Sequence, residues 1–210
     1  MNLKKLLLGA VAGMLLASSA EAQVNAIPQF GVNTENLRHN TFSAISVALV
    51  PAASATDVWC ISAGASKNIY LEALNISGTA GTAVTTPVVL LRRNTALDSG
   101  GTAATGLALP VGGGNNYSQN GTSSAVLTAY TANPTVNDAS PTYLRAAELA
   151  LPTSSATLTQ NLLFPIGTAA SEYDQEFILT KGTTQQICIN LNGASVTSGS
   201  LVIWAEWTEY

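Results

Sequence analysis

Apolar and polar residues alternate in short stretches from about residue 41 to the end of the chain. The clearest case is 185–191, where Ile or Leu occupies every second position and the residues between them are polar or Cys. A period of two is typical of a half-buried β-strand. We predict strands at Thr41–Val50, Asp57–Ser62, Lys67–Ser77, Val84–Arg93, Ser124–Thr131, Tyr143–Leu151, Asn161–Ile166, Gln175–Lys181, Gln185–Leu191 and Ser200–Thr208.

The spacing of these stretches favours an all-β fold. They begin roughly 10 to 17 residues apart and are separated by Gly, Pro, Asn and Ser, as in antiparallel sandwiches and jelly rolls. Only Tyr143–Leu151 could instead form an amphipathic helix. The sequence therefore predicts one all-β domain over residues 41–210, an antiparallel β-sandwich with a jelly-roll-like topology.

Several local signals add detail. The strand at 67–77 is apolar on both faces for part of its length, so we expect it to be covered on both sides. Pro87 indicates a sheet edge or a bulge in its strand, because proline cannot donate to a ladder. Asn192-Gly193 predicts a turn. Residues 94–123 are rich in glycine and predict surface loops, without the Lys-Ser/Thr that completes a phosphate-binding loop.

The first residues have the order of a secretory signal. Lys4 and Lys5 precede an uncharged stretch at 6–17, and Ala20-Glu21-Ala22 supplies small residues for cleavage. The apolar stretch is about 12 residues long, too short to span a bilayer core of about 30 Å. We expect a signal peptide at 1–22, an extended arm at 23–40, no membrane span, and a protein exported to the periplasm or beyond (in the virion if phage-encoded).

Charge and cysteine content narrow the function. Charged residues make up 10% of the chain and its formal net charge is −4, which argues against binding nucleic acid through phosphate neutralisation. Cys60 and Cys188 would meet an oxidising compartment after export. A disulfide would close a loop of about 129 residues and stabilise the fold by about 4 to 5 kcal/mol in the chain-entropy model. The alternative is two separate buried thiols.

Few residues carry recognisable chemistry. The single histidine, His39, lies in the arm with no strand to position it for catalysis. Glu172, Asp174 and Glu176 would share one face of an extended segment. They could hold Ca²⁺ or supply an acid/base pair for glycoside hydrolysis, or simply form a solvated edge. We expect no catalytic residues and no cofactor.

Aromatic and basic residues leave further alternatives open. Trp204 and Trp207 lie three positions apart, so they face opposite sides of one strand and at least one belongs in the core. Arg92-Arg93 indicates a solvated strand end, or an arginine that pairs with a carboxylate. The candidates for a sugar-binding platform are Trp59, Trp204, Trp207, Tyr117, Tyr130 and Tyr143.

Two motifs carry a resemblance to a known family. They are Ala129-Tyr130-Thr131-Ala132-Asn133-Pro134-Thr135 and the ending Glu206-Trp207-Thr208-Glu209. With other stretches between residues 41 and 210, the sequence resembles a family of tailed-phage and prophage proteins described as virion structural proteins. The resemblance implies a β-rich structural component without catalytic residues. The signal peptide is not typical of that family, so a cellular relative exported to the periplasm or beyond is the alternative.

These observations predict a non-enzymatic, exported structural or interaction protein. We expect it to be a subunit of a virion-like or extracellular assembly, with self-association or other assembly proteins as partners. The alternative is a secreted β-sandwich module that binds surface glycans through loops such as 106–123. An exported hydrolase using the carboxylates of residues 172–176 is a third possibility.

Overall fold

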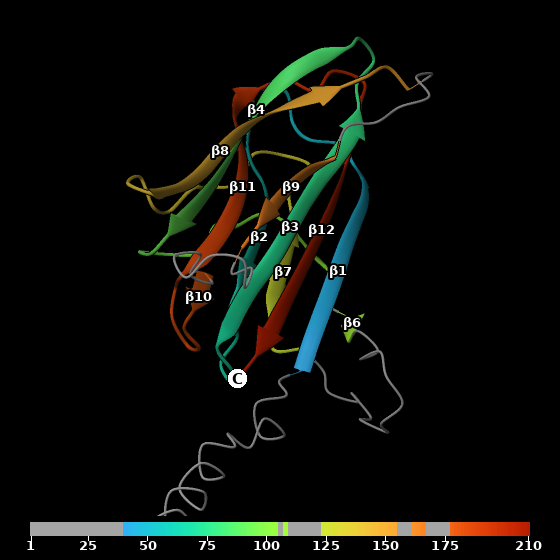
Figure 1. Ribbon diagram of the computed structural model, residues 1–210. Coiled ribbons are helices and arrows are strands. Elements are labelled where there is room, and N and C mark those ends of the chain that lie inside the picture. Colours follow the sequence, from blue (N-terminus) through green and yellow to red (C-terminus); the bar gives the residue numbers. More distant parts are fainter. Residues whose placement is uncertain (1–39, 105–106, 109–122, 155–160, 167–176) are drawn as a thin grey trace, which may run out of the picture. The chain divides into compact units, whose positions relative to one another are not determined.

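The computed structural model describes residues 40–104, 107–108, 123–154, 161–166 and 177–210 (Figure 1). The expected signal peptide, the arm up to residue 39 and His39 lie outside this part of the chain. The described strands are β1 (Asn40–Leu49), β2 (Ala55–Ser62), β3 (Ile69–Thr79), β4 (Val84–Arg93), β5 (Thr102–Ala104), β6 (Leu107–Ala108), β7 (Val126–Ala129), β8 (Thr142–Leu151), β9 (Leu162–Pro165), β10 (Phe177–Leu179), β11 (Gln186–Ala194) and β12 (Ser200–Glu209).

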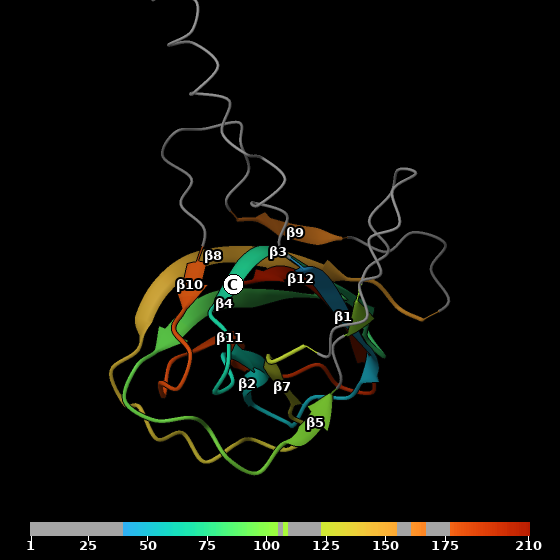
Figure 2. The ribbon, with the colours of Figure 1, turned by 90° about the horizontal axis from the view of Figure 1, so that it is seen from below.

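These strands form two antiparallel sheets that pack face to face (Figures 1 and 2). Sheet A has the order β10-β3-β12-β1-β6, and β9 also pairs with β3. Sheet B has the order β5-β7-β2-β11-β4-β8. The predicted all-β antiparallel sandwich is confirmed. The helical alternative for Tyr143–Leu151 is wrong, because this segment is β8 and pairs with β4 along its length. In the described part of the chain no helix is long and apolar enough to cross a membrane.

One apolar core lies between the sheets. Alternation along β12 buries Leu201, Ile203, Ala205 and Trp207 and leaves Trp204 partly exposed, so the two tryptophans face opposite sides as the sequence predicted. Sheet B contributes the other half of the core with Trp59, Ile61, Val88, Leu90, Leu127, Leu149, Ile187, Ile189 and Leu191. Side chains of both sheets form a single cluster, so their burial stabilises the pairing of the two layers.

The prediction that residues 67–77 carry apolar side chains on both faces is wrong for Leu71 and Leu74, which share one face, and a β-bulge explains why. Two adjacent residues of β12 pair with Leu71 and Ala73, so Glu72 is an extra residue in β3. The extra residue reverses the alternation of the strand at this point. Leu71 and Leu74 therefore both point into the core between the sheets.

Asn192-Gly193 also forms a bulge instead of the predicted turn. Both residues have left-handed backbone angles, with φ of 53° and 77°, but they lie inside β11. The register of β11 on β2 is broken between Asn190 and Ala194. Asparagine and glycine tolerate positive φ better than other residues, which is why the same dipeptide serves turns and bulges.

The proline signal is confirmed in part. β4 is an internal strand of sheet B, but β11 pairs with it only over Val89–Arg93. Pro87 lies outside that stretch and pairs only with β8. Its missing N–H therefore falls where β4 has a neighbour on one side only.

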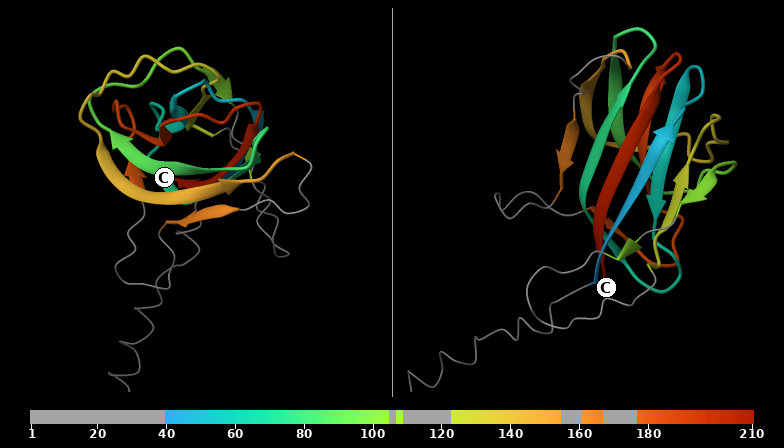
Figure 3. Two further views of the ribbon diagram at one scale, coloured as in Figure 1. Left: turned by 90° about the horizontal axis from the view of Figure 1, so that it is seen from above. Right: turned by 90° about the vertical axis from the view of Figure 1, so that its right-hand side faces the viewer.

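Two loops cover the outer face of sheet B, which points away from sheet A. They are the β4–β5 loop (residues 94–101) and the β7–β8 loop (residues 130–141), and Figures 2 and 3 show both on the side of β2 and β11 that faces away from β3 and β12. Beneath them lies a second apolar cluster of Cys60, Leu91, Tyr130 and Cys188. Sheet B is thus buried on both faces around Cys60 and Cys188 of β2 and β11.

Candidate functional site

The disulfide that the sequence predicted lies under these loops. Cys60 in β2 and Cys188 in β11 are register partners and are bonded to each other. Both are buried, with exposures of 2% and 0%. The bond therefore joins two adjacent strands on the outer face of sheet B, where no solvent reaches it directly.

Beside the disulfide, Arg93 is the centre of a buried cluster of charges. Its Nε and Nη2 both lie 2.6 Å from Oδ2 of Asp57, and its Nη1 donates to the backbone carbonyl of Asp138 at 2.6 Å. Nε is also 3.4 Å from Oδ2 of Asp98. This cluster joins β2 and β4 to both covering loops.

The interpretation of Arg92-Arg93 as a solvated strand end is therefore wrong for Arg93. Arg93 is 4% exposed because its side chain points into the space below the loops. Arg92, on the opposite face of β4, is partly exposed and donates to the Ile178 carbonyl and to Gln185 Oε1. Adjacent residues of one strand point to opposite faces, which separates the two arginines.

The pKa values of the two loop carboxyl groups, Asp138 and Asp98, are shifted in opposite directions. Asp138 accepts the backbone N–H groups of Asn94, Thr95 and Ser140, and these hydrogen bonds lower its pKa. Burial, followed by the hydrogen bond and the charge of Asp57, raises the pKa of Asp98 to about 7. Asp138 is thus held as an anion, while Asp98 has an environment that favours its neutral form.

Residues of the Ala129–Thr135 motif fasten the β7–β8 loop. The Tyr130 backbone N–H donates to the Val58 carbonyl at 2.9 Å, and the Tyr130 ring is buried. Asn133 Oδ1 accepts the Thr56 backbone N–H at 3.0 Å, and its Nδ2 donates to the Ser54 carbonyl at 3.2 Å. These contacts give the motif a structural role in this chain, because they hold the β7–β8 loop against β2.

The C-terminal Glu206–Glu209 motif holds the segment before β7 against the end of β12. Glu209 is buried, and its carboxylate accepts hydrogen bonds from Ser123 Oγ (2.6 Å), Ser124 N (2.9 Å), Ala125 N (3.3 Å) and Trp207 Nε1 (3.1 Å), with Lys67 Nζ at 3.8 Å. The carboxylate ties the chain that enters β7 to the end of β12. Trp207 also stacks on Phe42 in the core, with ring centroids 6.0 Å apart.

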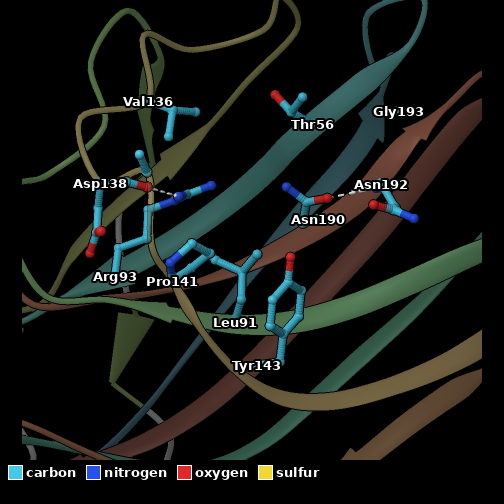
Figure 4. Close-up of a pocket in the computed structure, with 11 residues that line it drawn as sticks. Thr56, Leu91, Arg93, Val136, Asp138, Pro141, Tyr143, Asn190, Asn192 and Gly193 are labelled. Carbon is cyan, nitrogen blue, oxygen red and sulfur yellow. Dashed lines mark hydrogen bonds between the residues drawn. The ribbon is translucent and has the colours of Figure 1, made fainter.

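A pocket of about 310 Å³ opens beside the charge cluster (Figure 4). Tyr143, which is 71% exposed, forms one wall, and Asn190 and Asn192 of β11 lie opposite its hydroxyl. Arg93 and Thr56 line it as well. The buried Thr56 Oγ1 has no hydrogen-bond partner among the described residues. The pocket thus combines an exposed aromatic ring with amide and hydroxyl groups.

The other site residues proposed from sequence do not meet in the described structure. Glu172, Asp174 and Glu176 lie outside the described residues, as does Tyr117. Trp59, Trp207 and Tyr130 are buried and cannot form a sugar platform. Of the aromatic candidates in the described part of the chain, Tyr143 alone lines the pocket.

One group of described residues has the composition of a metal site. Ligand atoms of Asp57, Cys60, Asp98 and Cys188 all lie within 4.8 Å of one another. The two sulfurs are bonded to each other, and the Asp57 carboxylate is bound by Arg93. We therefore interpret the group as an ion cluster packed on a disulfide.

Comparison with known proteins identifies no relative of this chain. The chain has no significant match to a family model, to a curated protein or to a solved structure. Function therefore has to be argued from the fold and from these two features, the buried cluster and the pocket.

Proposed function

We propose that the protein is a non-enzymatic, exported subunit of a virion-like or extracellular assembly, built on a jelly roll. The strand order carries the proposal. The rows β1-β12-β3-β10 and β2-β11-β4-β8 pair the first strands of the chain with the last, as a chain folded into two Greek keys does. Viral capsid proteins and lectins share this architecture. The resemblance to phage virion proteins agrees with it.

The outer face of sheet A offers a surface that such a subunit would bury. Ile45 pairs with Trp204, Trp204 with Asn75, and Asn75 with Leu163, so these four side chains form one row across four strands. Ile45 and Leu163 are more than half exposed. An exposed apolar row of this kind is typical of interaction surfaces.

Sedimentation velocity on the exported protein tests the proposal. We expect a defined oligomer or polymer that dissociates in the Ile45→Lys variant. The matched control is Val126→Lys, which places the same charge at an exposed valine of sheet B and should leave the assembly intact. A strictly monomeric protein at high concentration would contradict the proposal.

Glycan binding is a second candidate function, and the Tyr143 pocket favours it. An exposed aromatic ring can stack on a sugar face, while the exposed Asn192 amide can hydrogen-bond its hydroxyls. Polysaccharide arrays should detect binding that Tyr143→Ala abolishes and Tyr143→Phe largely keeps. Because Tyr143 is exposed, neither variant should change the melting temperature. Equal binding by wild type and Tyr143→Ala would remove this candidate.

A further inference from the structure

The buried cluster holds two carboxylates for one guanidinium. The side chains of Asp57 and Asp98 are 0% exposed, and that of Arg93 is 5% exposed. A buried charge needs a partner or a proton, because desolvation of an unpaired carboxylate is expensive. With both carboxylates ionised, one negative charge would remain without a cation.

The two carboxylates differ in the number of hydrogen-bond donors around them. Asp57 accepts Arg93 at Oδ2 and the Asn190 amide at Oδ1. The remaining terminal nitrogen of Arg93 is directed to the Asp138 carbonyl. Asp98 has weaker support: Arg93 Nε lies 3.4 Å from its Oδ2, and among the described residues no donor makes a well-formed hydrogen bond to either of its carboxylate oxygens. A protonated Asp98 resolves this, because its O–H can donate to Asp57.

In the described part of the chain, the groups that face Asp98 are Asp57 of β2, Arg93 of β4, Tyr130 and Asn137 of the β7–β8 loop, Gln186 of β11 and the disulfide. Arg93 is the one cation in this set. Burial, then Asp57 by its hydrogen bond and charge, raises the pKa of Asp98 to about 7, against the opposing effects of Arg93 and the Asn137 backbone N–H. Burial also raises the pKa of Tyr130 to about 12, so Tyr130 stays neutral near pH 7.

We propose that Asp57 and Asp98 share one proton, and that this proton latches both loops over the outer face of sheet B. Asp98 belongs to the β4–β5 loop, and Asp138 connects the β7–β8 loop to the same arginine. The loops are also joined to each other by backbone hydrogen bonds between Ser99 and Thr135. When the proton is lost, Asp57 and Asp98 are both negatively charged at close range. Their repulsion loosens both loops together.

The direction of the pH response follows from the raised pKa of Asp98. The folded state holds this proton up to about pH 7, whereas the unfolded chain loses it near pH 3.8. The stabilisation is therefore fully present below about pH 4 and is lost as the pH rises to about 7. The two loops are held closed at acidic pH and are loosened at alkaline pH. Their opening exposes the Cys60–Cys188 disulfide to solvent.

The rate at which a phosphine reduces Cys60–Cys188 measures this opening. After correction for the phosphine's own pH dependence, we expect reduction of the full-length expressed protein to accelerate up to about thirtyfold between pH 5.5 and 8.5. That factor is the change in the opening equilibrium for a carboxyl whose pKa is about 7 when closed and 3.8 when open.

Two asparagine variants separate the latch from general stability. Asp98→Asn supplies an N–H donor at every pH, so its reduction should be slow and independent of pH. Asp138→Asn puts an NH2 group in place of one of the two oxygens that accept the backbone N–H groups of Asn94, Thr95 and Ser140, so at least one N–H loses its acceptor. This variant should be reduced faster at both pH values and keep the wild-type pH dependence. If the ratio of the reduction rates at pH 8.5 and pH 5.5 were the same in wild type and in Asp98→Asn, the proposal would be overturned. Should Asp98→Asn not fold, the carboxyl ¹³C shift of Asp98 in the wild type decides: an inflection near pH 7 supports the latch, and one below pH 5 overturns it.

Discussion

Replacing Arg93 by methionine tests the energetic role of the buried cluster. Methionine keeps much of the apolar stem of arginine, so the change removes charge and hydrogen bonds more than volume. Asp57 would lose two contacts of 2.6 Å and remain buried without a cation, and the Asp138 carbonyl would lose its donor. Breaking a buried ion pair by removing one partner costs about 3 to 5 kcal/mol. An unsatisfied buried acceptor adds about 1 kcal/mol or more.

We therefore expect Arg93→Met to lower the free energy of unfolding by about 4 to 6 kcal/mol, a large part of the roughly 5 to 15 kcal/mol of a typical domain. Urea denaturation followed by tryptophan fluorescence measures the change. The control is Arg92→Met in the adjacent position, where a partly exposed arginine makes two hydrogen bonds and the expected loss is about 1 kcal/mol. If both variants lose about the same, the cluster does not hold the fold together as the structure indicates.

Three further predictions concern the core and the C-terminal motif. Glu209→Gln removes the negative charge and one of the two oxygens that face several buried donors, so calorimetry should show a loss of about 2 kcal/mol, and an unchanged melting temperature would contradict this role. Trp207→Ala should cost about 3 to 5 kcal/mol in urea denaturation, while Trp204→Ala on the outer face should cost about 1 kcal/mol; equal losses would mean that the two faces of β12 are assigned wrongly. Replacing both Cys60 and Cys188 by alanine should cost about 4 to 5 kcal/mol, and a loss below about 1 kcal/mol would show that the bond adds little to the packing.

Where alternation along a strand is regular, the sequence alone was enough to predict the fold. The bounds predicted for Val84–Arg93 are those of β4, and Trp204 and Trp207 lie on opposite faces of β12, as predicted. Prediction failed where an extra residue breaks the period. Glu72 in β3 and the Asn192-Gly193 pair in β11 are bulges, and a bulge depends on the partner strand as much as on the residues themselves.

The candidate site was harder to predict, because its residues are brought together only by the tertiary fold. Asp57, Asp98 and Asp138 lie 5 to 45 positions from Arg93 and come from β2 and two loops. One signal was present: Asp57 directly precedes the apolar run Val58–Ile61 in a chain with few charges. A charge in such a place requires a partner, although the sequence does not tell which one.

The first-to-last pairing of the strands also has a consequence for how the chain folds. β12 separates β1 from β3, and β11 separates β2 from β4, so both sheets lack an internal strand until residues 186–210 are present. Neither layer can be completed while the C-terminus is still being synthesised. Such non-local pairings give a high contact order, and chains of this type fold in milliseconds to seconds. β1 to β4 therefore lack these sheet neighbours, and their apolar faces stay uncovered, until residues 186–210 are available to pair.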